Sequence, residues 1–239
     1  MIVEGAISTK AVIQNNKRKV LKVYISKDKK TKDFNYIRKI SKANDIELIE
    51  LNKDDIGNFL TGKSHGGVGA LVEERINDKF CDGDIFYLDG IEDPFNLGYS
   101  LRTLYAFGIK NVLLSKRDYS SMEAQLLKSS AGAYDMLNIR VCDDALEEIK
   151  KYKDNGYYLY GLYRGENSKD VFDEEFKNKA LFMLGGEKRG ISSELLNMCD
   201  KFLYISYGSD FRNSLNACGA LDVVATLLYR QRKNSWLLL

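Results

Sequence analysis

The chain has 239 residues, which suits one large domain or a small domain followed by a medium one. Hydrophobic residues make up 44% of it, enough to bury a core. The net charge of +2 excludes a global basic field, but residues 1–60 carry 13 Lys and Arg against 8 Asp and Glu. Such a basic front is typical of a segment that meets a polyanion, and equally of a solvated lysine-rich surface.

The four cysteines are dispersed and show no C-x-x-C spacing. We therefore expect neither a zinc site nor a redox motif, and no bound metal. Scattered thiols in a chain of this length fit a reducing compartment. The first residues lack the apolar core of a signal peptide, and no run reaches the roughly 18 apolar residues that a membrane span needs. These features predict a cytoplasmic protein without a membrane segment.

The first part of the chain predicts a compact mixed unit of strands and helices. A glycine-rich turn at 66–69 leads into its last strand, and the charged segment 73–84 predicts a linker. The expected elements are strand 20–26, helix 36–44, strand 46–51, helix 54–60 and strand 70–72.

From residue 84 onward, strands and helices alternate, which predicts a parallel sheet covered by helices on both faces. The expected strands are 85–88, 111–114, 139–141, 157–162, 181–184 and 202–205. The expected helices are 96–107, one that begins at 120, 144–151, 192–198 and 215–232. Ser120 and Glu123 have capping-box spacing, and Asp144 stands three residues before Glu147.

Three stretches carry candidate chemistry, and the first runs from Asp89 to Arg102. It follows a strand and opens a helix, at the sheet edge where open α/β folds bind ligands. Pro94 suits the first helical turn, and Asn96 is the expected helix cap. Arg102 stands on an otherwise apolar helix, about 240° around the axis from Asn96, so the two side chains leave from different faces.

The second stretch is an apolar strand that enters a glycine-rich turn containing Gly185, Gly186 and Gly190. Glycines let the backbone approach a ligand closely, although a plain turn has the same composition. The spacing is not G-x-G-x-x-G, and Ile191 stands where a P-loop requires lysine. The stretch therefore indicates neither a dinucleotide fingerprint nor an ATP phosphate cradle.

The third stretch is a strand that ends at Ile205, a loop, and a helix that begins near Ser214. Asn213 or Ser214 is the expected cap of that helix. Ser214, Asn216 and their neighbours crowd polar groups at the start of an apolar helix, more than one cap requires. A helix amino end also favours an anion such as phosphate.

Together the three stretches resemble the SpoU (TrmH-like) branch of the SPOUT methyltransferases, and the resemblance covers roughly residues 80–232. A motif similar to D-P-x-N-x-G-x-x-x-R is matched by Asp93, Pro94, Asn96, Gly98 and Arg102. One similar to G-x-E-x-x-G is matched by Gly185, Glu187 and Gly190, and one similar to I-P, a loop and S-L-N is matched by Ile205, Ser214, Leu215 and Asn216. The departures are Ser206 for proline, a loop one residue longer, Ala217-Cys218 for Val-Ser, and Gly186 where asparagine is common.

The resemblance implies an α/β fold with a parallel sheet and a C-terminal trefoil knot, a rare exception to unknotted topology. Residues 76–239 would form this SPOUT methyltransferase domain. Residues 1–75, with Gly5–Ile7 and His65–Val68, look like the small α+β L30-like RNA substrate-binding domain that often precedes it. A homodimer with active sites built from both subunits is also implied. The apolar stripe Leu221, Val224, Leu227 and Leu228 would supply part of that interface, or simply pack in the core.

The implied reaction is methyl transfer from S-adenosylmethionine to a ribose 2′-hydroxyl in structured RNA, with rRNA favoured over tRNA. The implied catalytic residues are Arg102, Asn96, Glu187, Ser214 and Asn216. The implied cofactor-binding residues are Gly185, Gly186, Gly190, Ile205 and Leu215. Because arginine stays charged, we do not expect Arg102 to act as a simple base. We expect its guanidinium to be buried beside the ribose hydroxyl, where it lowers the pKa of that hydroxyl and stabilises the developing alkoxide.

Other interpretations stay open at this point. The only histidine, His65, lies in a glycine-rich turn, which favours a structural or RNA-contacting role over that of a titrating base. A non-catalytic RNA-binding protein that keeps the fold is one alternative, and a base-nitrogen RNA methyltransferase is another. A dehydrogenase is disfavoured because the first strand of the α/β region is not followed by G-x-G-x-x-G.

Overall fold

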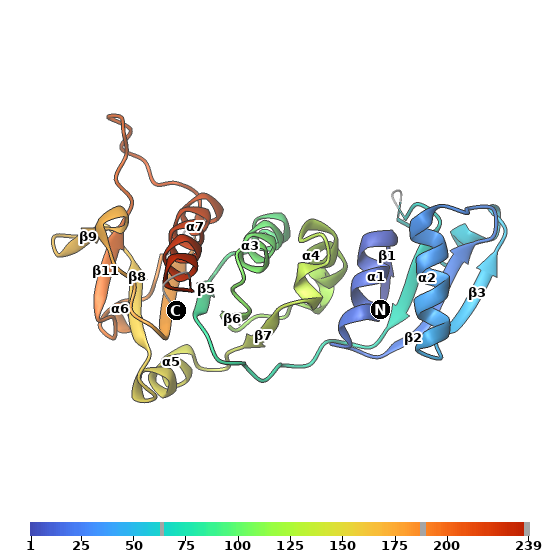
Figure 1. Cartoon of the computed structure of the whole chain (residues 1–239), viewed down its shortest axis with the longest axis horizontal. Helices are drawn as coiled ribbons and strands as arrows, with labels where there is room; N and C mark the ends of the chain where they lie inside the picture. The colour runs from blue at the N-terminus through green and yellow to red at the C-terminus, as the bar shows by residue number, and fades with distance from the viewer. Residues whose placement is uncertain (63–64, 187–189, 237–239) are drawn as a thin grey trace. The chain divides into compact units, whose positions relative to one another are not determined.

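The computed structural model describes residues 1–62, 65–186 and 190–236, with side chains described to residue 233 (Figure 1). The chain divides into two compact units. Unit 1 comprises Met1–Asp78 and Asp118–Met136, and unit 2 comprises Lys79–Arg117 and the chain from Leu137 onward. None of the helices in the described ranges is long and apolar enough to cross a membrane.

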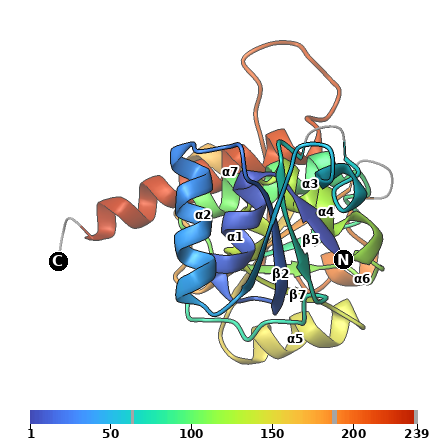
Figure 2. The same cartoon turned by 90° about the vertical axis from the view of Figure 1, so that its right-hand side faces the viewer.

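Unit 1 contains a four-stranded sheet with helices α1 and α2 side by side against it (Figure 2). The strand order is β1-β4-β2-β3, and only the β2–β3 pair is parallel. The strands are β1 (Ile2–Glu4), β2 (Val20–Ser26), β3 (Glu47–Leu51) and β4 (Val68–Val72). The helices are α1 (Ala6–Asn15), α2 (Lys32–Ala43) and α4 (Glu123–Ser129), with single 3-10 turns at Ile56–Asn58, Ser120–Met122 and Ala133–Asp135.

The sequence prediction of this unit was right for the central strands and incomplete elsewhere. It missed β1 and α1, because the buried side of α1 includes Ser8 and Thr9 and so shows no continuous apolar stripe. Helix α2 begins four residues earlier than expected, at a cap formed by the Thr31 hydroxyl. The helix expected at 54–60 is only a 3-10 turn.

A buried ion cluster holds residues 118–136 to the rest of unit 1. The Arg18 guanidinium donates to Glu123 at 2.6 Å and twice to Asp135 at 2.9 Å, and Arg75 donates to Asp135 at 2.9 Å. Both arginines lie over the Tyr134 ring. Burial disfavours the charged form of Arg18, but its bonds to Asp135 and Glu123 outweigh that effect and raise its pKa. The cluster therefore stays ionised and joins distant segments.

This cluster changes two predictions. Glu123 is not part of a capping box, because its carboxylate binds Arg18 and the Ser120 hydroxyl donates to Asp118 at 2.6 Å instead. The charged segment 73–84 is not a free linker throughout, since Arg75 is buried. The first unit break, after Asp78, lies close to the expected boundary, but segment 118–136 groups with the N-terminal residues.

Unit 2 is built on a seven-stranded sheet in the order β7-β6-β5-β10-β8-β11-β9, with every neighbouring pair parallel. The strands are β5 (Ile85–Asp89), β6 (Asn111–Leu114), β7 (Asn138–Val141), β8 (Tyr158–Leu162), β9 (Ser168–Asp170), β10 (Ala180–Gly185) and β11 (Lys201–Tyr204). The helices are α3 (Pro94–Ala106), α5 (Ala145–Asp154), α6 (Ser193–Leu196) and α7 (Ala217–Trp236). A 3-10 turn follows β9 at Val171–Asp173.

Both faces of this sheet are covered, as the alternating pattern predicted. On one face, Tyr87 and Met183 pack with Ile149 of α5 and Leu195 of α6. The other face carries α3 and α7, which contact each other (Figure 1). There Phe182 of β10 stacks between Phe86 and Tyr160, with ring centroids 5.0 and 5.1 Å away. Every strand was predicted except β9, whose sequence Ser-Lys-Asp gives no apolar signal.

Of the three helix caps predicted in unit 2, one was correct. Asp144 accepts from the Glu147 amide at 3.0 Å, as expected. Helix α3 is capped by Asp93 and not by Asn96, because the Asp93 carboxylate accepts from the amides of residues 95 and 96. Helix α7 is capped by Asn216, whose side-chain oxygen accepts from the amide of Gly219 at 2.8 Å, and not by Asn213 or Ser214.

We predict that Asp135→Ala destabilises the protein by about 3–5 kcal/mol, because it leaves two buried guanidinium groups without their shared carboxylate. Urea unfolding of the full chain measures the change. Lys10→Ala is the control: its partner Asp33 is exposed, so the loss should stay below about 1 kcal/mol. Equal stabilities of the two variants would contradict the role given to the cluster.

Candidate functional site

A cavity of about 310 Å³ opens at the carboxyl edge of the unit 2 sheet, beside the ends of β8, β10 and β11. Strand β10 is inserted between β5 and β8. The strands that follow β5 in sequence, β6 and β7, lie on one side of β10, and β8, β9 and β11 lie on the other, so the strand order reverses here. Open parallel sheets bind ligands at such a switch point. The cavity has the size of a small-molecule site. Its apolar walls are formed by Leu162, Leu184, Leu203, Ile205 and Leu215.

The structure brings together all five residues proposed to bind the cofactor. Gly185, Gly186, Gly190, Ile205 and Leu215 line this one cavity, although they come from two separate stretches of the chain. Ser214, from the proposed catalytic set, lines it as well. The second and third sequence motifs therefore converge on this cavity.

The turn after β10 is packed so tightly that only glycine fits. A Cβ atom on Gly185 would lie 2.1 Å from the carbonyl carbon of Gly190, and one on Gly186 would lie 2.3 Å from the carbonyl oxygen of Gly90. The Gly190 amide donates to the Gly186 carbonyl at 3.0 Å, and Gly190 has a φ of +65°. This explains why glycine stands at position 186, where the resemblance led us to expect asparagine.

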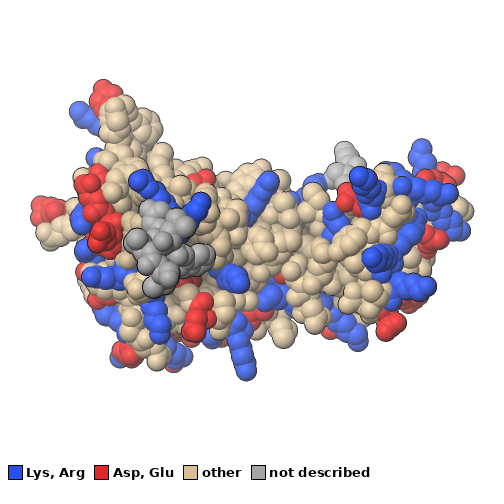
Figure 3. All heavy atoms as spheres, in the orientation of Figure 1, with Lys and Arg blue, Asp and Glu red and all other residues tan. Residues whose placement is uncertain are grey.

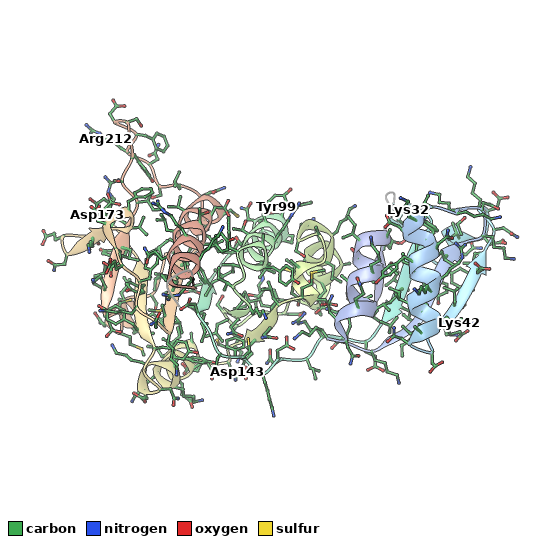
Figure 4. The ribbon with its side chains drawn as sticks, in the orientation of Figure 1. Lys32, Lys42, Tyr99, Asp143, Asp173 and Arg212 are labelled. Carbon is green, nitrogen blue, oxygen red and sulfur yellow. The ribbon has the colours of Figure 1, made fainter. Side chains whose placement is uncertain are left out.

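The long loop between β11 and α7 is held by Tyr207, whose hydroxyl accepts from the Leu215 amide at 3.0 Å. The Arg164 guanidinium lies over the Tyr207 ring at 5.8 Å from its centroid. Both residues line the cavity, as does Arg212 on the projecting part of the loop (Figure 4). Sequence reasoning missed Arg164 and Tyr207, although each follows the carboxyl end of a strand, where ligand-binding residues were to be sought.

Asn96 lines a smaller hollow of about 190 Å³ next to the cavity, together with Asp93, Gly186 and Ala217. Its backbone is fixed, because the Cys218 thiol donates to the Asn96 carbonyl at 3.0 Å. Its side-chain amide forms no hydrogen bond with another residue of the described ranges, so it is available to a ligand. Gly186 and Ala217 line both hollows, which places Asn96 beside the larger cavity.

Asp89 is a further acidic group at this edge of the sheet. Burial raises the pKa of its carboxyl group, although hydrogen bonds from Tyr87 and Ser115 act in the opposite direction. The Ser115 hydroxyl also accepts from the Gly90 amide at 3.0 Å, which fixes the turn that touches Gly186. Asp89 therefore helps, through Ser115, to hold the Gly90 turn against Gly186.

The remaining proposed catalytic residues are not all gathered in this cavity. Arg102 is exposed and lines neither hollow, so the expected buried guanidinium is wrong for the single chain. It shares the outer face of α3 with exposed Phe95 and Tyr99, because positions 95, 99 and 102 have i, i+4 and i+7 spacing; Figure 4 labels Tyr99. The side chain of Asn216 is used as a helix cap, and Glu187 lies outside the described residues.

Comparison with known sequences identifies the family. The profile described as "SpoU rRNA Methylase family" matches residues 84–226, more than half of the chain. The chain belongs to the SpoU rRNA methylase family. A second profile, "RNA 2'-O ribose methyltransferase substrate binding", matches residues 2–76. A Staphylococcus epidermidis protein named for the TrmH family of tRNA/rRNA methyltransferases is 30% identical over 222 residues, which are 88% of each chain.

Solved structures with this fold include other SpoU methyltransferases. AviRb from Streptomyces viridochromogenes is 20% identical and superposes with a TM-score of 0.80, covering 98% of this chain and 90% of AviRb. AviRb in complex with the cofactor AdoMet gives a TM-score of 0.77, covering 98% and 91%. The predicted SpoU resemblance and parallel α/β sheet are thus confirmed, and the predicted cofactor is the one bound in that related structure.

We predict that Gly186→Ala weakens S-adenosylmethionine binding about tenfold or more, because relieving the overlap with Gly90 costs roughly 1–3 kcal/mol. Isothermal titration calorimetry measures the change. Gly57→Ala is the control, since a Cβ there meets no atom within 4 Å. Normal affinity of the Gly186 variant would contradict the tight packing described for this turn.

We also predict that Tyr207→Phe weakens S-adenosylmethionine binding about fivefold, because the loop loses one hydrogen bond worth about 1 kcal/mol. Tyr158→Phe removes a hydroxyl at the opposite end of β8 and should leave the affinity unchanged. Titration calorimetry and the thermal midpoint of both variants are compared. A fall in thermal midpoint without a change in affinity would mean that Tyr207 serves stability alone.

Proposed function

We propose that this protein transfers a methyl group from S-adenosylmethionine to a ribose 2′-hydroxyl in structured RNA, with rRNA favoured over tRNA. The observation that carries the proposal is the convergence of the Gly185 turn, Ile205 and the Ser214–Leu215 segment on one cavity at the sheet switch point. Membership of the SpoU family supports the methyl transfer. The profile match over residues 2–76, described as substrate binding for RNA 2′-O ribose methyltransferases, supports the ribose target.

The cavity suits S-adenosylmethionine in its chemistry as well as its size. The leucine walls and Ile205 provide an apolar surface for adenine, and the glycine turn exposes backbone groups that can bind its polar edge. Arg164 and Arg212 supply positive charge for the methionine carboxylate. We infer that backbone at Gly185, Ile205 and Leu215 holds the adenine and methionine parts.

The position of Arg102 supports a homodimer with composite active sites. Arg102 lies on the same exposed face of α3 as Phe95 and Tyr99 and does not reach the cavity of its own chain, but a second copy packed on this face would cover all three side chains. Three members of the expected α7 stripe, Leu221, Val224 and Leu228, are buried inside the chain. The stripe therefore supplies core packing, and the interface would use the outer face of α3.

When bound, S-adenosylmethionine supplies a methyl group on a positively charged sulfur. The ribose hydroxyl becomes a competent nucleophile only as its proton is lost or shared. Arg102 of the partner subunit would lower the pKa of that hydroxyl and stabilise the negative charge that develops on its oxygen. Asn96 and Ser214 would orient the ribose and the adjoining phosphate. Asn216 would act through its cap on α7, and Glu187 is proposed from the motif alone.

Two further features complete the proposal. The C-terminal part, residues 76–239, would carry the trefoil knot, in keeping with the insertion of β10 between β5 and β8 and the contact of its turn with Gly90. Residues 1–75 would form the L30-like RNA substrate-binding domain. Its mixed four-stranded sheet and the basic character of the first sixty residues support that assignment.

We predict that Arg102→Ala abolishes turnover and leaves S-adenosylmethionine binding nearly intact, because the arginine lies outside the cavity of its own chain. If it serves the partner's site, mixing Arg102→Ala chains with Gly186→Ala chains restores part of the activity, since each mixed dimer regains one complete site. Activity of the mixed sample is measured after exchange of subunits, at an S-adenosylmethionine concentration too low for Gly186→Ala chains alone to turn over. No recovery would place Arg102 in the site of its own subunit, and near-normal turnover of Arg102→Ala alone would reject its role.

Methylation mapping tests the function as a whole. RNA from cells lacking the protein is incubated with purified protein and S-adenosylmethionine carrying a labelled methyl group. Digestion and mass spectrometry then identify the labelled nucleoside. A 2′-O-methylnucleoside in rRNA is expected, because the proposed residues activate a hydroxyl and offer no group for a base nitrogen. A labelled base, or no label with any RNA, would overturn the proposal.

A further inference from the structure

Unit 1 carries a strongly basic segment that the proposed chemistry does not use. Residues 27–32, called the lysine loop here, run from the end of β2 to the start of α2 and hold four lysines and one aspartate. All six residues are exposed. Lys and Arg side chains gather over the end of unit 1 that includes α2 (Figure 3), and Lys32 marks the amino end of that helix (Figure 4).

The lysines of this loop have no acidic partners, unlike many cations elsewhere in the unit. Across the described parts of the chain, Lys27, Lys30 and Lys32 form no ion pair, and Lys29 binds a carbonyl oxygen. Several cations elsewhere in unit 1, although not all, are neutralised in ion pairs such as Lys10–Asp33, Lys17–Asp78, Lys22–Glu47 and Arg38–Glu50. The positive charge of the loop is therefore left for a ligand.

The backbone of the lysine loop is fixed from behind by Arg38. Its guanidinium donates to the Ser26 carbonyl at 3.0 Å and to the Lys29 carbonyl at 3.1 Å, so it holds the start and the middle of the loop. Glu50 in turn accepts from Arg38 at 2.6 Å. Because the loop is already ordered, binding a polyanion costs less conformational entropy than it would for a free lysine-rich segment.

A second segment, His65–Gly67, lies against this loop. The Ser26 amide donates to the Gly67 carbonyl at 2.9 Å, and the Lys29 ammonium donates to the Gly66 carbonyl at 2.7 Å. Both glycines have positive φ, and a Cβ on Gly67 would lie 3.3 Å from that of Ser26, so the approach depends on glycine. Nδ1 of His65 accepts from the Gly67 amide at 2.9 Å. The neutral ring therefore carries its proton on Nε2, which remains as a donor.

We propose that the lysine loop and His65 form a binding site for the sugar-phosphate backbone of RNA. Lysine ammonium groups neutralise phosphates, and a fixed imidazole donor suits a phosphate or ribose oxygen. Contacts of this kind fix the position of the RNA on the protein through its backbone. It rests on the proposed function only in taking RNA as the substrate.

Fluorescence anisotropy of the full-length protein with a fluorescein-labelled RNA hairpin tests the site. Lys30→Glu should weaken binding about tenfold at 0.1 M salt and reduce the slope of log affinity against log salt by about one. Lys42→Glu is the matched control, since Lys42 is equally exposed, lies at the other end of α2 (Figure 4) and changes the net charge by the same amount. It should change affinity less than about twofold. His65→Leu should weaken binding as well, with a small fall in the thermal midpoint because the Gly67 amide loses its acceptor.

Equal losses for Lys30→Glu and Lys42→Glu would overturn the proposal, because overall charge and not a site would then be responsible. Binding of the wild-type protein to phosphatidylserine vesicles but not to the hairpin would overturn it as well. The labelled methyl-transfer assay separates this proposal from the proposed function. If methyl transfer fails but Lys30→Glu still weakens RNA binding more than Lys42→Glu does, the RNA-binding site is supported and the proposed function is rejected. If methyl transfer succeeds but Lys30→Glu binds RNA normally, the proposed function is supported and the RNA-binding site is rejected.

Discussion

The structure depends above all on the contact between two backbone turns, one after β10 and one after β5. Neither Gly185 nor Gly186 has room for a single methyl group, because Gly190 and Gly90 already occupy the space. This contact requires β10 to lie beside β5, and its buried apolar residues keep it there between two parallel neighbours. The position of β10 in turn sets the gap between its own end and those of β8 and β11, which is the cavity.

Around that contact, the candidate residues fall into two groups. Those near the cavity are held by hydrogen bonds within the chain, and Arg102 lies outside the cavity. Asp93 and Asn216 fix the starts of α3 and α7, and Cys218 joins the two helices at the Asn96 carbonyl. Hydrogen-bonded backbone thus surrounds the cavity on the side of the sheet. Arg102, on the exposed outer face of α3, lies outside both hollows, and in the proposed homodimer it would serve the site of the partner subunit.

The sequence predicted the features that depend on local composition. Buried parallel strands are short apolar runs, and all but the polar strand β9 were recognised. The caps of α3 and α7 were misassigned because several capping residues stand close together, and apolar periodicity does not fix the first turn of a helix. The place of Arg102 and the grouping of residues 118–136 with unit 1 could not be predicted, because both depend on contacts across long stretches of chain. Glu123 is 105 residues from Arg18.

The ion cluster of unit 1 has a consequence for synthesis on the ribosome. Arg18 and Arg75 leave the exit tunnel well before Glu123 and Asp135, so their charges remain hydrated while β5 and β6 of the other unit are already being made. Many proteins complete their domains in order from the amino end. Here the earliest-made segment waits for a later one, and the two halves of the nascent polypeptide must mature in an interleaved order.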